Sequence, residues 1–256
     1  MNELISDPHF YAAAVPAVAL VGLSKGGLGG AMALIGVPLM TLVLPPVQAA
    51  AVMLPILVVM DIFALWSWRG YRDAATLRHV LPGGILGIGI GWMTAAIVTT
   101  AMIKLIVGVI AVASAGRWFF NRRRGRTTVK HQSAVRGTLW GTVTGFTSFV
   151  AHAGGPPYQI YALPLGHEPR VYTGTSTVFF AIVNAVKLVP FFALGQFDAT
   201  NLAASAVLVP IVPVAVLAGV VIVRRMDREV FYPFMYTMVL LVGAKLTWDG
   251  VSVILQ

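Results

Sequence analysis

One apolar run near the start of the chain is too long for a single helix across a bilayer and is broken in its middle. It extends from about Phe10 to Leu44, about 35 residues, and Ser24-Lys25-Gly26-Gly27-Leu28-Gly29-Gly30 interrupts it. A helix rises ~1.5 Å per residue, so one straight helix would overshoot a hydrocarbon core of ~30 Å. Cut at the glycines, the run yields two pieces of roughly 14 residues, each predicted to be too short to span alone.

A glycine-rich break in a membrane run favours a binding site. Non-helical backbone in a bilayer is tolerated where it is buried in protein or lines a cavity. The alternative is a kink or a close helix–helix contact through glycine. A second break, Ala151-His152-Ala153-Gly154-Gly155-Pro156-Pro157-Tyr158, interrupts the run 135–165, and Gly155 lies 125 positions after Gly30. Interrupted segments at matching places in two halves point to the binding site of a transporter.

Composition indicates an integral membrane protein. Of the 256 residues, 58% are hydrophobic and only 11% are charged, so no separate soluble domain is expected. Cysteine is absent, which excludes disulfides and thiolate metal sites, and we expect no metal and no cofactor. The net charge is +9, but the arginines cluster in loops, which is typical of orientation signals. The expected partners are the lipid bilayer and a small anion, without nucleic acid; a homodimer is left open.

The chain reads as a tandem duplication. Laid on each other, the two halves align Asp61 with Asn184 and Pro82 with Pro210. This predicts a first transmembrane repeat over 1–120, a basic linker over 121–134 and a second repeat over 135–256. Pro210 and Pro213 are expected to kink their span. Besides the two broken segments, the predicted spans are 47–66, 80–98, 102–120, 171–194, 202–223 and 231–248.

The basic loops predict how the halves are oriented. We place the loop 117–136 in the cytoplasm, because cytoplasmic loops are rich in Lys and Arg. The basic loop 224–228 then also falls inside, and the Arg-free loop 195–201 outside, only if the segment 135–165 dips to mid-membrane and returns. Each half becomes a re-entrant broken-helix hairpin plus three transmembrane helices. The predicted fold is therefore an all-α, multi-pass protein of the inner (plasma) membrane with two inverted-topology repeats.

Both breaks predict an anion site near the midplane. Each precedes the start of a half-helix, and proline suits the first turn of a helix. Helix N-termini offer free N–H groups and partial positive charge, which favour anions. Two such ends facing each other would hold a small oxyanion. The predicted substrate-binding residues are Ser24, Lys25, Gly27, Gly29, Gly30, Gly154, Gly155, Tyr158, Gln159, Thr175 and Ser176.

Four further intramembrane residues are candidates for coupling transport to another ion. Asp61 either exchanges a proton or pairs with Arg69, about two turns away. Lys187 shares a helix face with Asn184 and is either functional or reaches the outer surface. His152 either titrates or is a hydrogen-bonded structural histidine.

The breaks resemble those of the TauE/SafE family of sulfite and organosulfonate exporters, in the 4-toluene sulfonate uptake permease superfamily. Besides the stretch 24–30, the resemblance rests on Gly145-Phe146-Thr147-Ser148, on Gly154-Gly155-Pro156-Pro157 and on Gly174-Thr175-Ser176, and it covers nearly the whole chain. The basic middle loop departs from the family. The resemblance implies a secondary transporter of small sulfur-containing anions such as sulfite or sulfoacetate, exporting them from the cytoplasm.

Two other classes remain as alternatives. An anion channel would share the site but need a continuous polar path, whereas the polar residues cluster near the breaks. An intramembrane enzyme would need a nucleophile–base set or metal ligands, for which only His152 and Asp61 are available. We therefore expect a transporter and not an enzyme.

Overall fold

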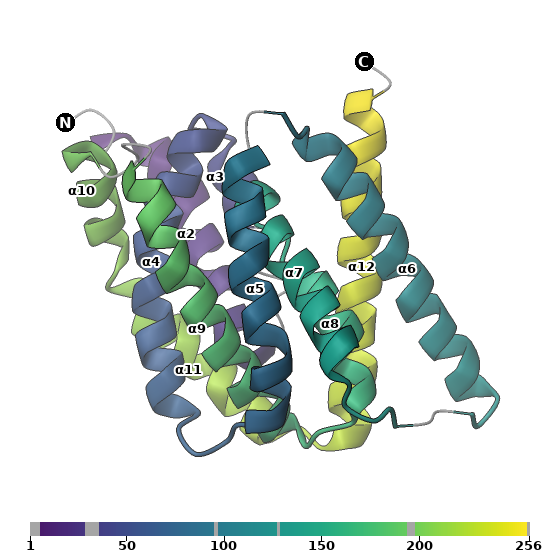
Figure 1. Ribbon diagram of the computed structural model, residues 1–256. Coiled ribbons are helices and arrows are strands. Elements are labelled where there is room, and N and C mark those ends of the chain that lie inside the picture. The colour runs from purple at the N-terminus through teal and green to yellow at the C-terminus, as the bar shows by residue number, and fades with distance from the viewer. Residues whose placement is uncertain (1–5, 29–35, 95–96, 127–128, 194–197, 255–256) are drawn as a thin grey trace.

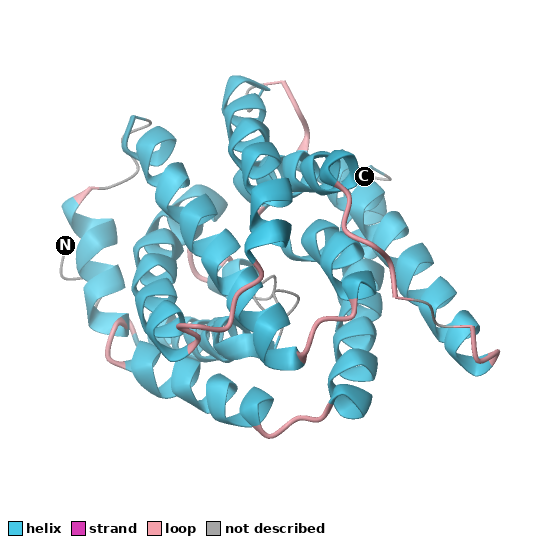
Figure 2. Ribbon diagram, turned by 60° about the horizontal axis from the view of Figure 1, so that its bottom comes forward, coloured by secondary structure: helices cyan, strands magenta, loops and turns pink. Residues whose placement is uncertain are grey.

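The computed structural model describes residues 6–28, 36–94, 97–126, 129–193 and 198–254. This part of the chain consists of helices and loops without a strand, which confirms the predicted all-α class (Figure 2). The helices, with the short turns η1 and η3, are α2 (Pro8–Leu23), η1 (Ser24–Leu28), α3 (Gly36–Met40), α4 (Pro46–Ser67), α5 (Ala74–Thr94), α6 (Thr100–Arg123), α7 (Ala134–Ala151), α8 (Gly155–Ala162), η3 (Leu163–Leu165), α9 (Pro169–Ala193), α10 (Ala199–Leu208), α11 (Ile211–Arg224) and α12 (Arg228–Ile254).

Several of these helices are long and apolar enough to cross a membrane. Within the described ranges there are five, or six if α10 and α11 form one bent span. The bend between them is 50° and Pro210 lies at the junction, as predicted from the prolines. The five are Pro8–Leu28, Pro46–Ser67, Thr100–Arg123, Pro169–Ala193 and Arg228–Val253.

The first broken segment differs from its prediction. The helical stretch Pro8–Leu28 has 21 residues and could cross a membrane by length and composition, so the expected piece of about 14 residues is wrong. It is longer because it starts at Pro8, where the Asp7 carboxylate accepts a hydrogen bond from the His9 N–H at 2.9 Å. It also continues through η1, which contains a kink at Gly27.

Glycines let α5 and α7 pack backbone to backbone. A Cβ placed on Gly83 would lie 2.1 Å from the Thr138 carbonyl oxygen, and one on Gly87 would lie 2.1 Å from the Thr142 oxygen. A glycine of α7 makes the same close contact, because a Cβ on Gly145 would lie 2.0 Å from a carbonyl oxygen of α5. The glycine-rich span was expected to allow such an approach, and α5 and α7 are in extensive contact.

A second glycine contact joins the first broken segment to α11. A Cβ on Gly26 would lie 2.2 Å from the Val216 carbonyl oxygen, and one on Gly219 would lie 2.3 Å from the Leu23 oxygen. Thus each broken segment is fastened, through glycine, to a long helix from the other half of the chain.

The basic loops share one end of the molecule. The loops that join α4 to α5, α6 to α7, η3 to α9 and α11 to α12 all lie at the bottom in Figure 1. α7 starts from this end, and η3, which follows α8, returns to it (Figure 1). The arginines of these loops, from Arg69 to Arg228, therefore all lie at one end of the molecule.

Candidate functional site

The first break contains a kink at a residue that only glycine suits. Gly27 has φ 135° and ψ −2°, a conformation that L side chains rarely adopt. The kink frees backbone carbonyls that a straight helix would bond. The Gly26 carbonyl accepts a hydrogen bond from the buried Trp68 indole N–H at 3.0 Å. Trp68, at the end of α4, thus replaces one of the lost backbone hydrogen bonds.

The second break is a short reversal between α7 and α8. His152 ends α7 with φ 52°, and the N–H groups of His152 and Ala153 turn back to the Thr147 carbonyl. α8 begins at Gly155, with prolines in its first turn as predicted. N–H groups in the first turn have no partner within the helix, so the prolines lose nothing there and favour a helix start at this point.

The two breaks border one partly open cavity of about 80 Å³. This is room for several waters or a small oxyanion. Gly29 and Gly30 lie outside the described residues. Thr175 is not among the lining residues. The predicted residues that line the cavity are Ser24, Lys25, Gly27, Gly154, Gly155, Tyr158, Gln159 and Ser176, together with the coupling candidates His152, Asn184 and Lys187.

Asp61 has both carboxylate oxygens occupied. Oδ1 accepts from the Lys25 ammonium at 2.5 Å, and Oδ2 accepts from the Asn184 amide at 2.6 Å. The Asp61 side chain is only 5% exposed. The alternative pairing with Arg69 is wrong, because that guanidinium lies 5.5 Å from the Trp66 ring instead. Lys25 and Asp61 are therefore a neutral buried pair beside the cavity.

Lys187 is a buried cation that has no such partner among the described residues. It is 1% exposed, so it does not reach the surface, and that alternative is wrong. Its ammonium donates to the carbonyl and hydroxyl oxygens of Ser148 at 3.4 and 3.3 Å, which are long bonds. Within the described ranges no carboxylate lies within 4 Å of it. Its charge is thus unbalanced at the cavity wall.

Several neutral polar atoms at the cavity are also unused. Within the part of the chain that the structure describes, the Tyr158 hydroxyl, the amide atoms of Gln159 and Nε2 of His152 have no hydrogen-bond partner of normal geometry. Buried polar groups normally find partners. One unbalanced ammonium beside unused donors suits a small anion with several acceptor oxygens.

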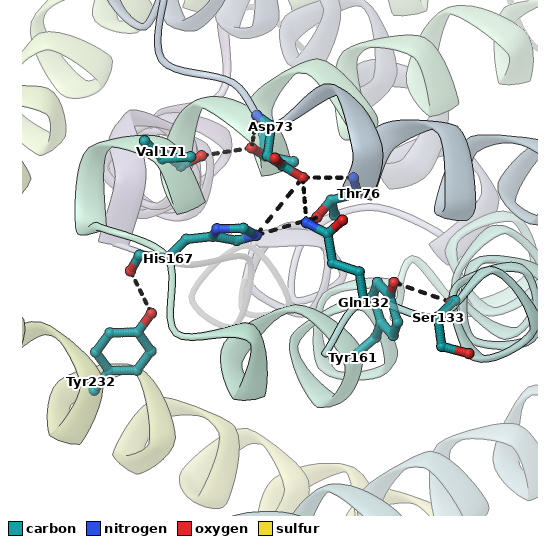
Figure 3. Close-up of polar contacts among 9 residues, drawn as sticks. Asp73, Thr76, Gln132, Ser133, Tyr161, His167, Val171 and Tyr232 are labelled. Atoms are coloured by element: carbon teal, nitrogen blue, oxygen red, sulfur yellow. Dashed lines mark hydrogen bonds and ion pairs between the residues drawn. The ribbon is translucent and has the colours of Figure 1, made fainter. Parts of the chain in front are cut away.

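A second polar cluster holds the bottom end of the molecule together (Figure 3). The Asp73 carboxylate accepts from the Thr76 N–H at 2.6 Å and from the Gln132 amide at 2.8 Å. The Thr175 hydroxyl accepts from the Asp73 N–H at 2.8 Å and donates to the Val171 carbonyl at 2.6 Å. This explains where Thr175 lies: it ties the α4–α5 loop to α9.

His167 completes this cluster. Its Nε2 lies 3.2 Å from the Thr76 hydroxyl and 4.0 Å from Oδ1 of Asp73 (Figure 3). Burial lowers the pKa of His167, and the charge of Arg228 adds to this, although the charge of Asp73 opposes it. Burial would raise the pKa of Asp73, but hydrogen bonds from Thr76 and Gln132 and the charge of His167 outweigh it and lower that pKa.

Comparison with known proteins identifies the family. The family model for the sulfite exporter TauE/SafE matches residues 14–246, nearly the whole chain. The chain belongs to this family. It is therefore a multi-pass membrane transporter of the sulfite exporter family, and the enzyme alternative is set aside. No curated protein and no solved structure matches it.

The sequence left several lining residues unassigned. Ser148, Tyr172, Thr177 and Phe180 also line the cavity. Ser148 stands in one of the TauE/SafE motifs, and Thr177 stands beside Ser176, so a polar signal was present for both. Tyr172 and Phe180 read as ordinary span residues, and only the packing of α9 reveals their place.

Proposed function

We propose that this TauE/SafE protein exports small sulfur-containing oxyanions, such as sulfite or sulfoacetate, from the cytoplasm and holds them in the cavity between the two breaks. The anion lies near the N-terminus of α8, where the positive end of the helix dipole favours negative charge. Pro156 and Pro157 carry no N–H, so the first turn contributes this dipole and not a set of backbone donors. The matching half-helix end after Gly29 and Gly30 lies outside the described residues.

The unbalanced charge of Lys187 is the observation that carries this proposal. An isolated buried ammonium is costly, so it is normally paired or loses its proton, and a bound anion would supply the missing partner. Lys25 does not supply the charge in this state, because Asp61 already neutralises it at 2.5 Å. An oxyanion in the cavity would balance Lys187 and accept from Tyr158 and Gln159.

The contacts between helices support two inverted repeats. Asp61 and Asn184, which align between the halves, are hydrogen-bonded to each other at 2.6 Å, as expected near a two-fold axis. The contact of α5 with α7 has its counterpart in the contact of α11 with α2, with the halves exchanged. α4 with α9 and α6 with α12 are pairs of equivalent helices in contact. Such symmetry is the usual framework of alternating access.

The arginine distribution supports the orientation. All basic loops share the bottom end in Figure 1, which we propose to be the cytoplasmic end in the inner membrane. On this assignment α7 and α8 enter from the cytoplasm and return to it, as a re-entrant hairpin. The linker 121–134 is then cytoplasmic.

Anion-dependent thermal stabilisation of the purified protein tests the site. Sulfite, sulfoacetate, sulfate and taurine are added in turn, since a ligand that binds the folded state raises the unfolding temperature. We expect stabilisation by at least one sulfur oxyanion, loss of it in Lys187→Met and partial retention in Lys187→Arg. Lys245→Met is the matched control, because Lys245 lies on α12 at 44% exposure, away from the cavity.

Two results would contradict the proposal. If none of the four compounds stabilises the parent protein, the cavity is not a site for these anions. If Lys187→Met is stabilised as much as the parent, the anion binds elsewhere or without this charge.

A further inference from the structure

We propose that Asp61 takes up a proton when the anion binds, which frees Lys25 to contact the anion together with Lys187. This inference rests on the proposed function, because it concerns the same cavity. It assigns to the Lys25–Asp61–Asn184 cluster the coupling of anion binding to protonation.

The position of the pair carries the first step. Lys25 and Asn184 line the cavity, whereas Asp61 is not a lining residue and lies behind them, held by both. The Lys25 ammonium also lies 5.8 Å from the ring centre of Phe180, another lining residue. An anion in the cavity therefore competes with Asp61 for the same ammonium.

Electrostatics decides how that competition ends. If the anion drew Lys25 away, an ionised carboxylate that is 5% exposed would lose its countercharge. Removing one partner from a buried ion pair is strongly unfavourable. Protonation avoids this cost: a proton adds to a carboxylate oxygen of Asp61, the N–H···O contact with Lys25 breaks, and a contact between Lys25 and the anion replaces it.

Asn184 suits both states of Asp61. Its amide now donates to the carboxylate, and the same amide can accept a hydrogen bond from a carboxylic acid if it turns over. The neutral acid therefore keeps a partner after Lys25 has left. An arginine or lysine in place of Asn184 would hold Asp61 ionised.

Among the described residues of the surrounding helices, no other acid can substitute for Asp61. The elements packed on α4 are α2, η1, α3, α9, α10 and α11. Their ionisable side chains near Asp61 are Lys25 and Lys187. Arg224, at the end of α11, donates to the Ser67 carbonyl, and α3 and α10 contain no ionisable side chain. The remaining ionisable groups of these elements are His9 and Tyr11 in the first turn of α2 and Arg170 and Tyr172 in the first turn of α9.

Linkage gives the proposal a measurable form. If the bound state holds one proton more than the free state, then proton binding and anion binding strengthen each other equally. The Kd for the anion then rises with pH, by up to about tenfold per pH unit where binding takes up one proton. Each binding event takes up as much as one proton from solution.

The experiment counts protons during binding. Sulfoacetate is added to the purified full-length protein in weak buffer containing a pH indicator, and the Kd is measured from pH 6 upward. Sulfoacetate itself neither takes up nor releases protons in this pH range, because its carboxyl group, with a pKa of about 4, is already fully ionised. Asp61→Asn mimics the neutral acid, and Lys25→Met removes the ammonium that protonation would free.

A matched control is available in the second Asp–Lys pair. Lys245 and Asp249 are 2.7 Å apart on α12, but they are exposed and lie away from the cavity. We expect proton uptake in the parent and in Asp249→Asn, and none in Asp61→Asn or Lys25→Met. Asp61→Asn should also bind with a Kd that no longer changes with pH.

The outcomes separate the two proposals. Binding of sulfoacetate by the parent with no proton uptake and a constant Kd would overturn the coupling while leaving the anion site intact. Proton uptake that persists in both Asp61→Asn and Lys25→Met would also overturn it. Failure of the parent to bind any of sulfite, sulfoacetate, sulfate and taurine would overturn the proposed function, and the coupling with it. If Asp61→Asn does not fold, the coupling is tested by proton uptake in Lys25→Met and by the pH dependence of the parent's Kd.

Discussion

At the scale of single residues, a broken helix depends on side chains that satisfy the backbone it exposes. Gly27 kinks the backbone, and the Gly26 carbonyl next to it accepts a hydrogen bond from the Trp68 indole. Trp68 in turn lies under the Arg224 guanidinium, which is 5.6 Å from its ring centre. The first break is therefore held by a tryptophan 42 residues later in the chain.

Replacing Trp68 with phenylalanine tests this support. The variant keeps an aromatic ring but leaves the buried Gly26 carbonyl without its indole donor, at a cost of roughly 1–3 kcal/mol. We expect a lower thermal unfolding temperature and weaker anion stabilisation. Trp66→Phe is the control, because Trp66 is 61% exposed, and its effect should be within about 0.5 kcal/mol. Equal behaviour of the two variants would contradict the role of Trp68.

At the scale of elements, the fold depends on where glycines fall on a helix face. On α5, Gly83 and Gly87 meet the backbone of α7, whereas a Cβ on Gly89 would meet no atom of the described residues within 4 Å. The helix therefore has one face that binds α7 and another that does not.

Two alanine substitutions on α5 separate these faces. Gly87→Ala would place a methyl group 2.1 Å from the Thr142 carbonyl oxygen, so it should destabilise the protein by roughly 1–3 kcal/mol. Gly89→Ala meets nothing in the described part of the chain and should be neutral or stabilising by up to ~1 kcal/mol, because alanine favours helix. Thermal unfolding in detergent measures both. Similar stability of the two variants would show that α5 and α7 are not so close.

The His167–Asp73 cluster should make stability depend on pH. The pKa of His167 is lowered from 6.5, so the folded state favours the neutral ring, and this contribution is present above about pH 6.5. It is lost as the pH falls below that value. The lowered pKa of Asp73 adds a similar loss only below about pH 3.8.

Unfolding temperatures between pH 7.5 and 5 check this sign. The parent should lose stability on acidification, and His167→Gln should lose less. His131→Gln, at an exposed site in the linker, should follow the parent. A parent that becomes more stable on acidification while His167→Gln does not would show that the sign is wrong.

Much of the element pattern could be predicted, and long-range pairing could not. The prolines after Gly155 and at Pro210 fix local backbone geometry, so the start of α8 and the bend before α11 follow from the sequence. The partner of Asp61 did not follow, because Lys25 lies 36 residues away and meets it only when η1 packs on α4. The surroundings of Lys187 likewise did not follow, because its ammonium meets Ser148, which lies 39 residues earlier in the chain.

At the scale of the whole molecule, the proposed topology places Arg225 and Ala199 on opposite sides of the membrane. The junction at Arg225 lies among the basic loops, and Ala199 begins α10 at the opposite end in Figure 1. Both residues are exposed, and the chain contains no cysteine, so single cysteines can be labelled without background.

Cysteine labelling in intact cells tests the topology. With an impermeant thiol reagent, Ala199→Cys should react from outside and Arg225→Cys only after the membrane is opened. The reverse pattern would exclude the proposed orientation. Reaction of both from the same side would exclude an odd number of crossings between them.

The central claim is that Lys187 carries the charge of a transported sulfur oxyanion, and sulfite flux into proteoliposomes tests it most directly. The parent and Lys245→Met should transport sulfite at equal rates, and Lys187→Arg should retain part of the rate. Lys187→Met should lose at least about tenfold, as expected when a charged hydrogen bond of roughly 1.5–3 kcal/mol is removed. A folded Lys187→Met protein that transports sulfite as fast as the parent would contradict the account.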